Sequence, residues 1–286
     1  MSARIGQVEH FITAPGGCMW VRVKQALGSV PREAGSWMLV SQAAILNTIG
    51  GGQLEFLAID HARRLLKGDD VPHVLDIPLG PDIGQCCGGR VVLGFDVLDA
   101  TGERHLLASL KEQQAAQPHI FVFGAGHVGR ALAETLAPLP YNVAVVDTRP
   151  DLLDGIDSRV AGHVSPVPET FVRSAPVGSA FVAVTHDHAL DFMVTREALL
   201  RRDASYVGMI GSGTKRAQFK RWFLEERGNL ACFEGLVCPI GAGAAADKRP
   251  EIIAVLTSAE LICNMGQQHC LELSPVPAFA SIGGDA

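Results

Sequence analysis

The chain has 286 residues, of which 48% are apolar and 19% are charged, and its formal net charge is −6. This composition is typical of a globular protein with two ordinary domains and excludes an intrinsically disordered chain. The negative charge argues against broad nucleic-acid or anionic-membrane binding, and no apolar run reaches the ~20 residues that span a bilayer. Because the first residues also lack the apolar segment of a secretory signal, we expect a cytoplasmic protein.

The first 110 residues are predicted to form an α/β domain. Strands are expected at residues 19–26, 38–40, 74–78 and 90–97. A helix is expected over 53–67, ending at Gly68. Glycine-rich loops at 28–35 and 47–52 connect these elements.

The second half has the pattern of a parallel sheet. Residues 101–118 are polar and lack a strong apolar period after Leu110, so we predict a linker over 111–118. Strands are then expected at 119–123, 143–147, 180–185 and 206–210, and helices at 127–136, 189–202, 214–227 and 250–264. This alternation predicts a Rossmann-like, doubly wound sheet over 119–273. We expect a disordered tail over 274–286.

A glycine fingerprint follows the first of these strands. Gly124, Gly126 and Gly129 fit the spacing GxGxxG between a strand and a helix, and Asp147 ends the next strand. The glycines and the helix N-terminus predict a site for a pyrophosphate, and Asp147 is placed for a ribose 2′-hydroxyl. Arg149 leaves a 2′-phosphate open, and an emptied site is the alternative. The predicted nucleotide-binding residues are Gly124, Gly126, His127, Val128, Gly129, Asp147, Ser212 and Lys215.

Two further loops are expected at the carboxyl ends of the strands. The segment 211–216 places Ser212, Lys215 and Arg216 at a helix start, which suits an anion or is only a solvated helix terminus. His186 and His188 form an HxH pair, for which ordinary loop histidines are a better interpretation than metal ligands.

Residues 84–89 read Gly-Gln-Cys-Cys-Gly-Gly. Consecutive Cα atoms lie about 3.8 Å apart, whereas a relaxed disulfide needs roughly 4.4–6.8 Å, so Cys86 and Cys87 are predicted to be free thiols. Flanking glycines let the backbone approach a ligand closely, and Arg90 favours the reactive thiolate. The pair suits a soft ligand or sulfur transfer. The seven cysteines show no CxxC spacing, which weakens zinc, disulfide and redox-sensor interpretations.

These motifs stand in an order that resembles the XdhC/CoxI family, and within it the xanthine dehydrogenase accessory proteins, from about residue 19 to 261. The motifs are Gly-Ser-Val-Pro-Arg at 28–32, Ile-Gly-Gly-Gly at 49–52, the double-cysteine loop, the glycine fingerprint, Gly-Met-Ile-Gly-Ser at 208–212 and Cys-Pro-Ile-Gly at 238–241. The resemblance implies an XdhC/CoxI-type domain over 1–110. It also implies a chaperone, rather than an enzyme, that binds the molybdenum cofactor molybdopterin, holds it for sulfuration and inserts it into xanthine dehydrogenase.

The resemblance also implies a site and partners. Contact with the cofactor or sulfur handling is expected for Cys86, Cys87, Gln85, Arg32, Gln53 and Glu55, and any metal contact is through the cofactor's molybdenum. A solvated Arg32 and a Glu55 that only complements the helix dipole are the alternatives. The expected partners are the molybdenum subunit of xanthine dehydrogenase, a cysteine desulfurase, molybdenum-cofactor biosynthesis proteins and a second copy of the chain. NAD or NADP is a further expected cofactor.

A second hypothesis comes from a different class of protein. An NAD(P)-dependent oxidoreductase would use the Rossmann half for hydride transfer, with His186 or His188 as proton donor. That hypothesis leaves the two adjacent thiols without a role.

Overall fold

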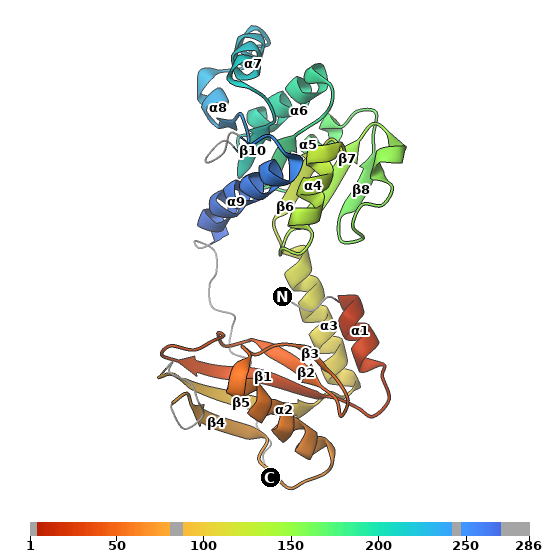
Figure 1. Cartoon of the computed structure of the whole chain (residues 1–286), viewed down its shortest axis with the longest axis vertical. Coiled ribbons are helices and arrows are strands. Elements are labelled where there is room, and N and C mark those ends of the chain that lie inside the picture. The colour runs from red at the N-terminus through yellow and green to blue at the C-terminus, as the bar shows by residue number, and fades with distance from the viewer. Residues whose placement is uncertain (1–4, 81–87, 242–246, 270–286) are drawn as a thin grey trace. The chain divides into compact units, whose positions relative to one another are not determined.

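A computed structural model describes residues 5–80, 88–241 and 247–269, with the side chains of 266–269 excepted (Figure 1). Gln85, Cys86, Cys87 and the expected tail over 274–286 lie outside these ranges. The chain divides into two compact units, Met1–Ala115 and Ala116–Ala286. Among the described helices, none combines the length and apolar character that crossing a membrane requires.

The first unit is a five-stranded antiparallel sheet with the order β3-β2-β1-β5-β4. Its strands are β1 (Met19–Leu27), β2 (Trp37–Val40), β3 (Ile45–Asn47), β4 (Val74–Pro78) and β5 (Arg90–Val97). Its helices are α1 (Ile5–Ile12), α2 (Gly52–Leu66) and α3 (Ala100–Ala115). The strands predicted from the sequence and the long helix after the second glycine loop are therefore confirmed.

Helices cover both faces of this sheet (Figure 1). Side chains alternate along a strand, so Met38 and Val40 pack with α2 residues such as Leu54. Trp37 and Leu39 face the opposite way and pack with α1 and α3. All four residues of β2 are consequently buried.

The polar segment before the second unit is a helix, and the expectation of a linker was wrong for residues up to Ala115. Only Leu106 and Leu110 of α3 are buried. One narrow apolar stripe is enough to hold a helix against a sheet, and the polar remainder of its surface faces water. The prediction failed because the weak apolar periodicity of this segment was interpreted as an absence of periodicity.

The second unit is a six-stranded parallel sheet with the order β11-β10-β9-β6-β7-β8. Its strands are β6 (His119–Phe123), β7 (Asn142–Asp147), β8 (Ala161–Val164), β9 (Ala180–Ala183), β10 (Tyr206–Met209) and β11 (Leu236–Val237). Read from β8, the chain order is 3-2-1-4-5-6, the Rossmann order, and the predicted doubly wound sheet is confirmed. The order reverses between β6 and β9, which is where such sheets bind ligands.

Two helical layers enclose the second sheet (Figure 1). Its helices are α4 (His127–Leu136), α5 (Glu169–Ser174), α6 (His188–Arg201), α7 (Gly213–Glu225), α8 (Leu230–Glu234) and α9 (Pro250–His269), with a 3-10 turn at Pro150–Leu153. Leu132 of α4 and Leu261 of α9 pack on one face. Val172 of α5, Val194 of α6 and Phe219 of α7 pack on the other.

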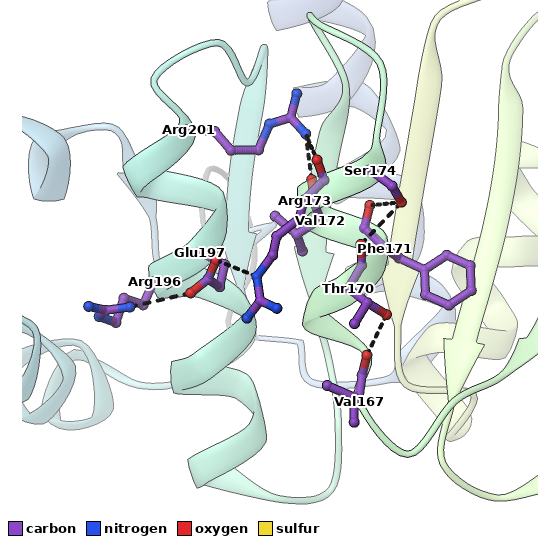
Figure 2. Close-up of polar contacts among 9 residues, drawn as sticks. All are labelled: Val167, Thr170, Phe171, Val172, Arg173, Ser174, Arg196, Glu197 and Arg201. Carbon is purple, nitrogen blue, oxygen red and sulfur yellow. Dashed lines mark hydrogen bonds and ion pairs between the residues drawn. The ribbon is translucent and has the colours of Figure 1, made fainter.

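Arginine contacts fix the short helix α5 to α6 (Figure 2). Arg173 Nε donates to the Glu197 carboxylate at 3.1 Å, and Arg201 Nη1 donates to the Val172 carbonyl oxygen. The partly exposed ion pair contributes at most about 1 kcal/mol. The bond from Arg201 satisfies a carbonyl that the end of a helix leaves unpaired, and therefore caps the last turn of α5.

Candidate functional site

The glycine fingerprint occupies the point where the strand order of the second unit reverses. Gly124 has φ of 110°, and a β-carbon there would lie 2.6 Å from the Val184 carbonyl oxygen, so the loop after β6 touches the loop after β9. A β-carbon at Gly129 would lie 1.8 Å from the Gly124 carbonyl oxygen. These two glycines are required by the protein's own packing.

Gly126 differs from its two neighbours in the fingerprint. Its φ is −70°, which any residue adopts, and a β-carbon would have open space around it. It is the N-cap of α4 and provides no side-chain hydrogen bond to the first turn. The helix therefore presents amide donors beside an open position, an arrangement suited to an anionic group. His127 is exposed and Val128 is half-buried in this first turn.

Asp147 is buried at the carboxyl end of β7, beside the fingerprint. Its Oδ2 accepts from the Ala125 amide at 2.7 Å and from Arg149 Nη2 at 3.2 Å. Its Oδ1 accepts from the amide and the Nε of Arg149, at 2.9 and 3.0 Å. Burial alone would raise the pKa of Asp147, but the bonds from Arg149 and Ala125 hold that pKa below its usual value. The side chain is therefore a fixed carboxylate.

The loops after β9 and β10 line an open hollow of about 300 Å³ at the same edge of the sheet. It is lined by Thr185, His186, His188, Ile210, Gly211, Ser212 and Lys215. The loops expected at the carboxyl ends of the strands are thus brought together. Ser212 is the N-cap of α7, and its hydroxyl accepts from the Lys215 amide at 3.2 Å.

A buried ion pair lies in the wall of this hollow. Lys215 Nζ donates to Asp191 Oδ2, and the two side chains are 9% and 0% exposed. Asp191 Oδ1 also accepts from the amide and hydroxyl of Thr185, at 2.9 and 2.8 Å. The ion pair, together with the bonds from Thr185, therefore connects α7, α6 and the loop after β9. Lys215 was predicted to contact a nucleotide, and here it has a protein carboxylate as its partner.

Two features were not predicted from the sequence. One is Asp191, and the other is the bidentate ion pair that the Nε and Nη2 of Arg149 form with Asp147, called the fork below. Asp191 lies in the run Ala-Leu-Asp-Phe-Met, where an acid among apolar residues is a signal of a buried, paired charge. Its partner is 24 positions away on another helix, so only the strand order identifies the pair.

In the first unit, residues 88–89, which follow the two cysteines, contact the glycine-rich loop at 28–35, called the first glycine loop below. Gly88 forms an isolated parallel bridge with Ser29. The amide of Gly88 donates to the Leu79 carbonyl at 2.9 Å, and the Leu79 amide donates to the Gly89 carbonyl at 2.8 Å. A β-carbon at Gly89 would lie 2.2 Å from the Ser29 carbonyl oxygen. Close backbone packing therefore requires glycine here.

The second glycine loop packs against the first. A β-carbon at Gly50 would lie 2.8 Å from Pro31 Cβ and 3.3 Å from Arg32 Cγ. Glu55 Oε2 accepts from the Thr48 hydroxyl and from the amides of Ile49 and Gly51, each amide at 3.1 Å. Glu55 is thus the residue that shapes this loop. The structure brings segments 28–32, 48–52 and 88–89 into one cluster.

Of the remaining residues predicted for this site, two lie within the described ranges and three lie outside them. Arg32 is exposed beside Gly50, and Gln53 is exposed in the first turn of α2. Gln85, Cys86 and Cys87 lie outside the described residues, so their role stays a prediction. Within the described ranges, no group of three or more His, Cys, Asp and Glu side chains could hold a metal ion.

We expect Gly89→Ala to lower the free energy of unfolding by about 1–3 kcal/mol, because its methyl group would overlap the Ser29 carbonyl. Chemical denaturation followed by circular dichroism measures the change. Gly80→Ala is the matched control, since a β-carbon there would meet no atom of the described residues within 4 Å. Equal stabilities for the two variants would contradict the close approach.

The fold and the site define a two-unit α/β protein with a Rossmann-type parallel sheet in one unit and a cluster of glycine loops in the other. The model of the XdhC and CoxI family matches residues 12–76, and the model of the XdhC Rossmann domain matches residues 120–261. The chain belongs to the XdhC and CoxI family.

Two relatives extend the comparison. The uncharacterized protein YqeB of Escherichia coli K12 is 25% identical over 255 residues, which are 84% of this chain and 42% of that protein. The chain thus spans less than half the length of this curated relative. A crystal structure from Bacillus halodurans, described as a xanthine dehydrogenase, is 18% identical with a TM-score of 0.76. The match covers 96% of this chain and 98% of that one, and shows a shared fold.

Proposed function

We propose that this protein binds the molybdenum cofactor, holds it while a sulfido ligand is installed, and inserts it into xanthine dehydrogenase. The observation that carries the proposal is the meeting of three glycine-rich segments in the first unit, one of which leads directly into Cys86 and Cys87. Membership of the XdhC and CoxI family supports a role in xanthine dehydrogenase maturation.

The cargo has three chemical parts that such a cluster suits. Molybdopterin presents a phosphate, a soft dithiolene-bound metal and a flat pterin with polar edges. Exposed Arg32 and the glycine loop shaped by Glu55 suit the phosphate and the polar edges. Thiolates are the soft ligands that a thiophilic metal centre favours, which is the proposed role of Cys86 and Cys87.

The proposal includes partners and a compartment. A cysteine desulfurase would supply the sulfur, molybdenum-cofactor biosynthesis proteins would supply the cofactor, and the molybdenum subunit of xanthine dehydrogenase would receive it. The protein would act in the cytoplasm as a homodimer. Gel filtration with light scattering, alone and with each partner, tests these associations.

We expect the double variant Cys86→Ala/Cys87→Ala, expressed in cells that make molybdopterin, to lose most of the molybdenum and pterin that co-purify with the native chain. Elemental analysis and pterin fluorescence measure both components. Cys263→Ala is the matched control, because Cys263 is an exposed cysteine on α9 in the other unit. Full retention of cofactor by the double variant would remove the thiols from the proposal.

We further propose that the second unit binds a dinucleotide. The Rossmann strand order and the open position at Gly126 support this part of the proposal. Binding without hydride transfer is the expected result, and reduced-nicotinamide absorbance distinguishes it from the oxidoreductase alternative. That alternative is favoured by one observation, the hollow that His186 and His188 line.

A further inference from the structure

The carboxylate of Asp147 has no acceptor position left for a ligand. A carboxylate offers about four lone-pair positions, two on each oxygen. Four protein donors use them here: the amide of Ala125 and the amide, Nε and Nη2 of Arg149. The side chain is also 3% exposed. Asp147 is therefore fully bonded and covered within the protein itself.

This geometry conflicts with the usual role of an acid at the end of the second Rossmann strand, which is to accept bonds from a ribose 2′-hydroxyl. A hydroxyl could bond to Asp147 only by displacing a donor. Loss of the Ala125 bond would leave an unpaired amide in the glycine loop, and loss of the Arg149 bonds would break the fork. Asp147 is better suited to hold the loop and the arginine in place.

The group that this edge of the site does present is the guanidinium of Arg149. Its side chain is 37% exposed, and the fork uses its Nε and Nη2, which leaves Nη1 outside the pair. Asp151 is an exposed carboxylate close enough to interact with Arg149. It lowers the local positive charge, but water screens such exposed charges strongly.

We propose that Arg149 makes the Rossmann site of this protein selective for a dinucleotide that carries a phosphate on its adenosine ribose, such as NADP. The fork with Asp147 uses one proton each of Nε and Nη2, so the two protons of Nη1 and the second proton of Nη2 remain as donors, and a phosphate supplies the matching acceptors. A ribose with free hydroxyls brings donors that find no free acceptor at Asp147. This inference rests on the proposal that the second unit binds a dinucleotide.

Isothermal titration of the full chain with NADP⁺ and with NAD⁺ tests the inference, with 2′,5′-ADP and ADP as probes that lack the nicotinamide. We expect the 2′-phosphorylated ligand of each pair to bind about 10- to 100-fold more tightly. In Arg149→Ala this ratio should fall to about one or reverse, because the change also frees acceptor positions on Asp147.

Arg159→Ala is the matched control. Arg159 forms the same fork with Asp157, through its amide, Nε and Nη2, but it precedes β8 and therefore lies at the opposite edge of the parallel sheet from Asp147. The native preference should be unchanged in this variant. Circular dichroism of each variant confirms that the fold is retained.

The outcomes separate the two proposals. If NAD⁺ binds as tightly as NADP⁺ to the native chain, or if Arg149→Ala keeps the full preference, the inference is overturned while dinucleotide binding stands. If none of the four ligands binds, the dinucleotide proposal fails and this inference fails with it.

Discussion

Asp191→Ala is expected to lower the free energy of unfolding of the second unit by about 3–5 kcal/mol. The change removes the partner of Lys215, whose side chain is 9% exposed, and leaves an ammonium group buried without compensation. It also removes the acceptor for the amide of Thr185, whose hydroxyl keeps the Asp187 carbonyl oxygen as an acceptor. Urea denaturation followed by far-ultraviolet circular dichroism measures the change.

The comparison with other variants identifies the ion pair as the cause. Lys215→Met should destabilise by a similar amount, and the double variant with Asp191→Ala should lose less than the sum of the single changes. Arg221→Ala is the control, since its pair with Glu225 is exposed on α7 and contributes at most about 1 kcal/mol. A loss below 1 kcal/mol for Asp191→Ala would show that the pair is not what holds α6 and α7 together.

The ion pair also connects stability to the proposed binding of a dinucleotide. Thr185 and Lys215 both line the hollow between the loops after β9 and β10, and both donate hydrogen bonds to the carboxylate of Asp191. A site whose polar side chains are fixed before a ligand arrives loses less conformational entropy on binding. Variants of Asp191 should therefore weaken ligand binding in the hollow even where the fold survives.

Much of the fold was predictable from the sequence because apolar periodicity determines which segments can be buried. The structure reproduces the predicted bounds of β4, β5, β6 and α4. Two of the missed elements lack such a signal: β8 is Ala-Gly-His-Val with three exposed residues, and α3 buries only two leucines. Short or weakly amphipathic segments acquire their structure from neighbours, which a local pattern does not contain.

The site was predictable only where spacing along the chain reflects geometry. The glycine fingerprint is such a case, because tight turns impose fixed positions on glycine. Asp191 with Lys215, and Glu55 with the loop at Thr48, depend instead on how helices dock and loops fold back. The side chain of Asp147 shows the difference most clearly: its position at the strand end was predicted, but the arginine that occupies its oxygens was not.

Gly129→Ala is expected to disrupt the fingerprint itself. The added methyl group would lie 1.8 Å from the carbonyl oxygen of Gly124, a separation that backbone atoms do not tolerate, so α4 must move away from the loop. Leu132 and Leu136 of the same helix are fully buried in the core, and moving them opens packing defects. We expect a loss of about 3 kcal/mol in the free energy of unfolding, measured by denaturation, together with loss of nucleotide binding.

Gly126→Ala separates the binding role of the fingerprint from its structural role. Its φ of −70° suits alanine and a β-carbon there meets open space, so stability should fall by no more than about 1 kcal/mol, the usual effect of a poorer N-cap. The methyl group would nevertheless stand where a pyrophosphate approaches the amides of α4, and titration should show weakened dinucleotide binding. No packing within the described residues explains a glycine at this position, which leaves the approach of a ligand as its reason. A Gly126→Ala variant that binds a dinucleotide as well as the native chain would therefore place the phosphates elsewhere.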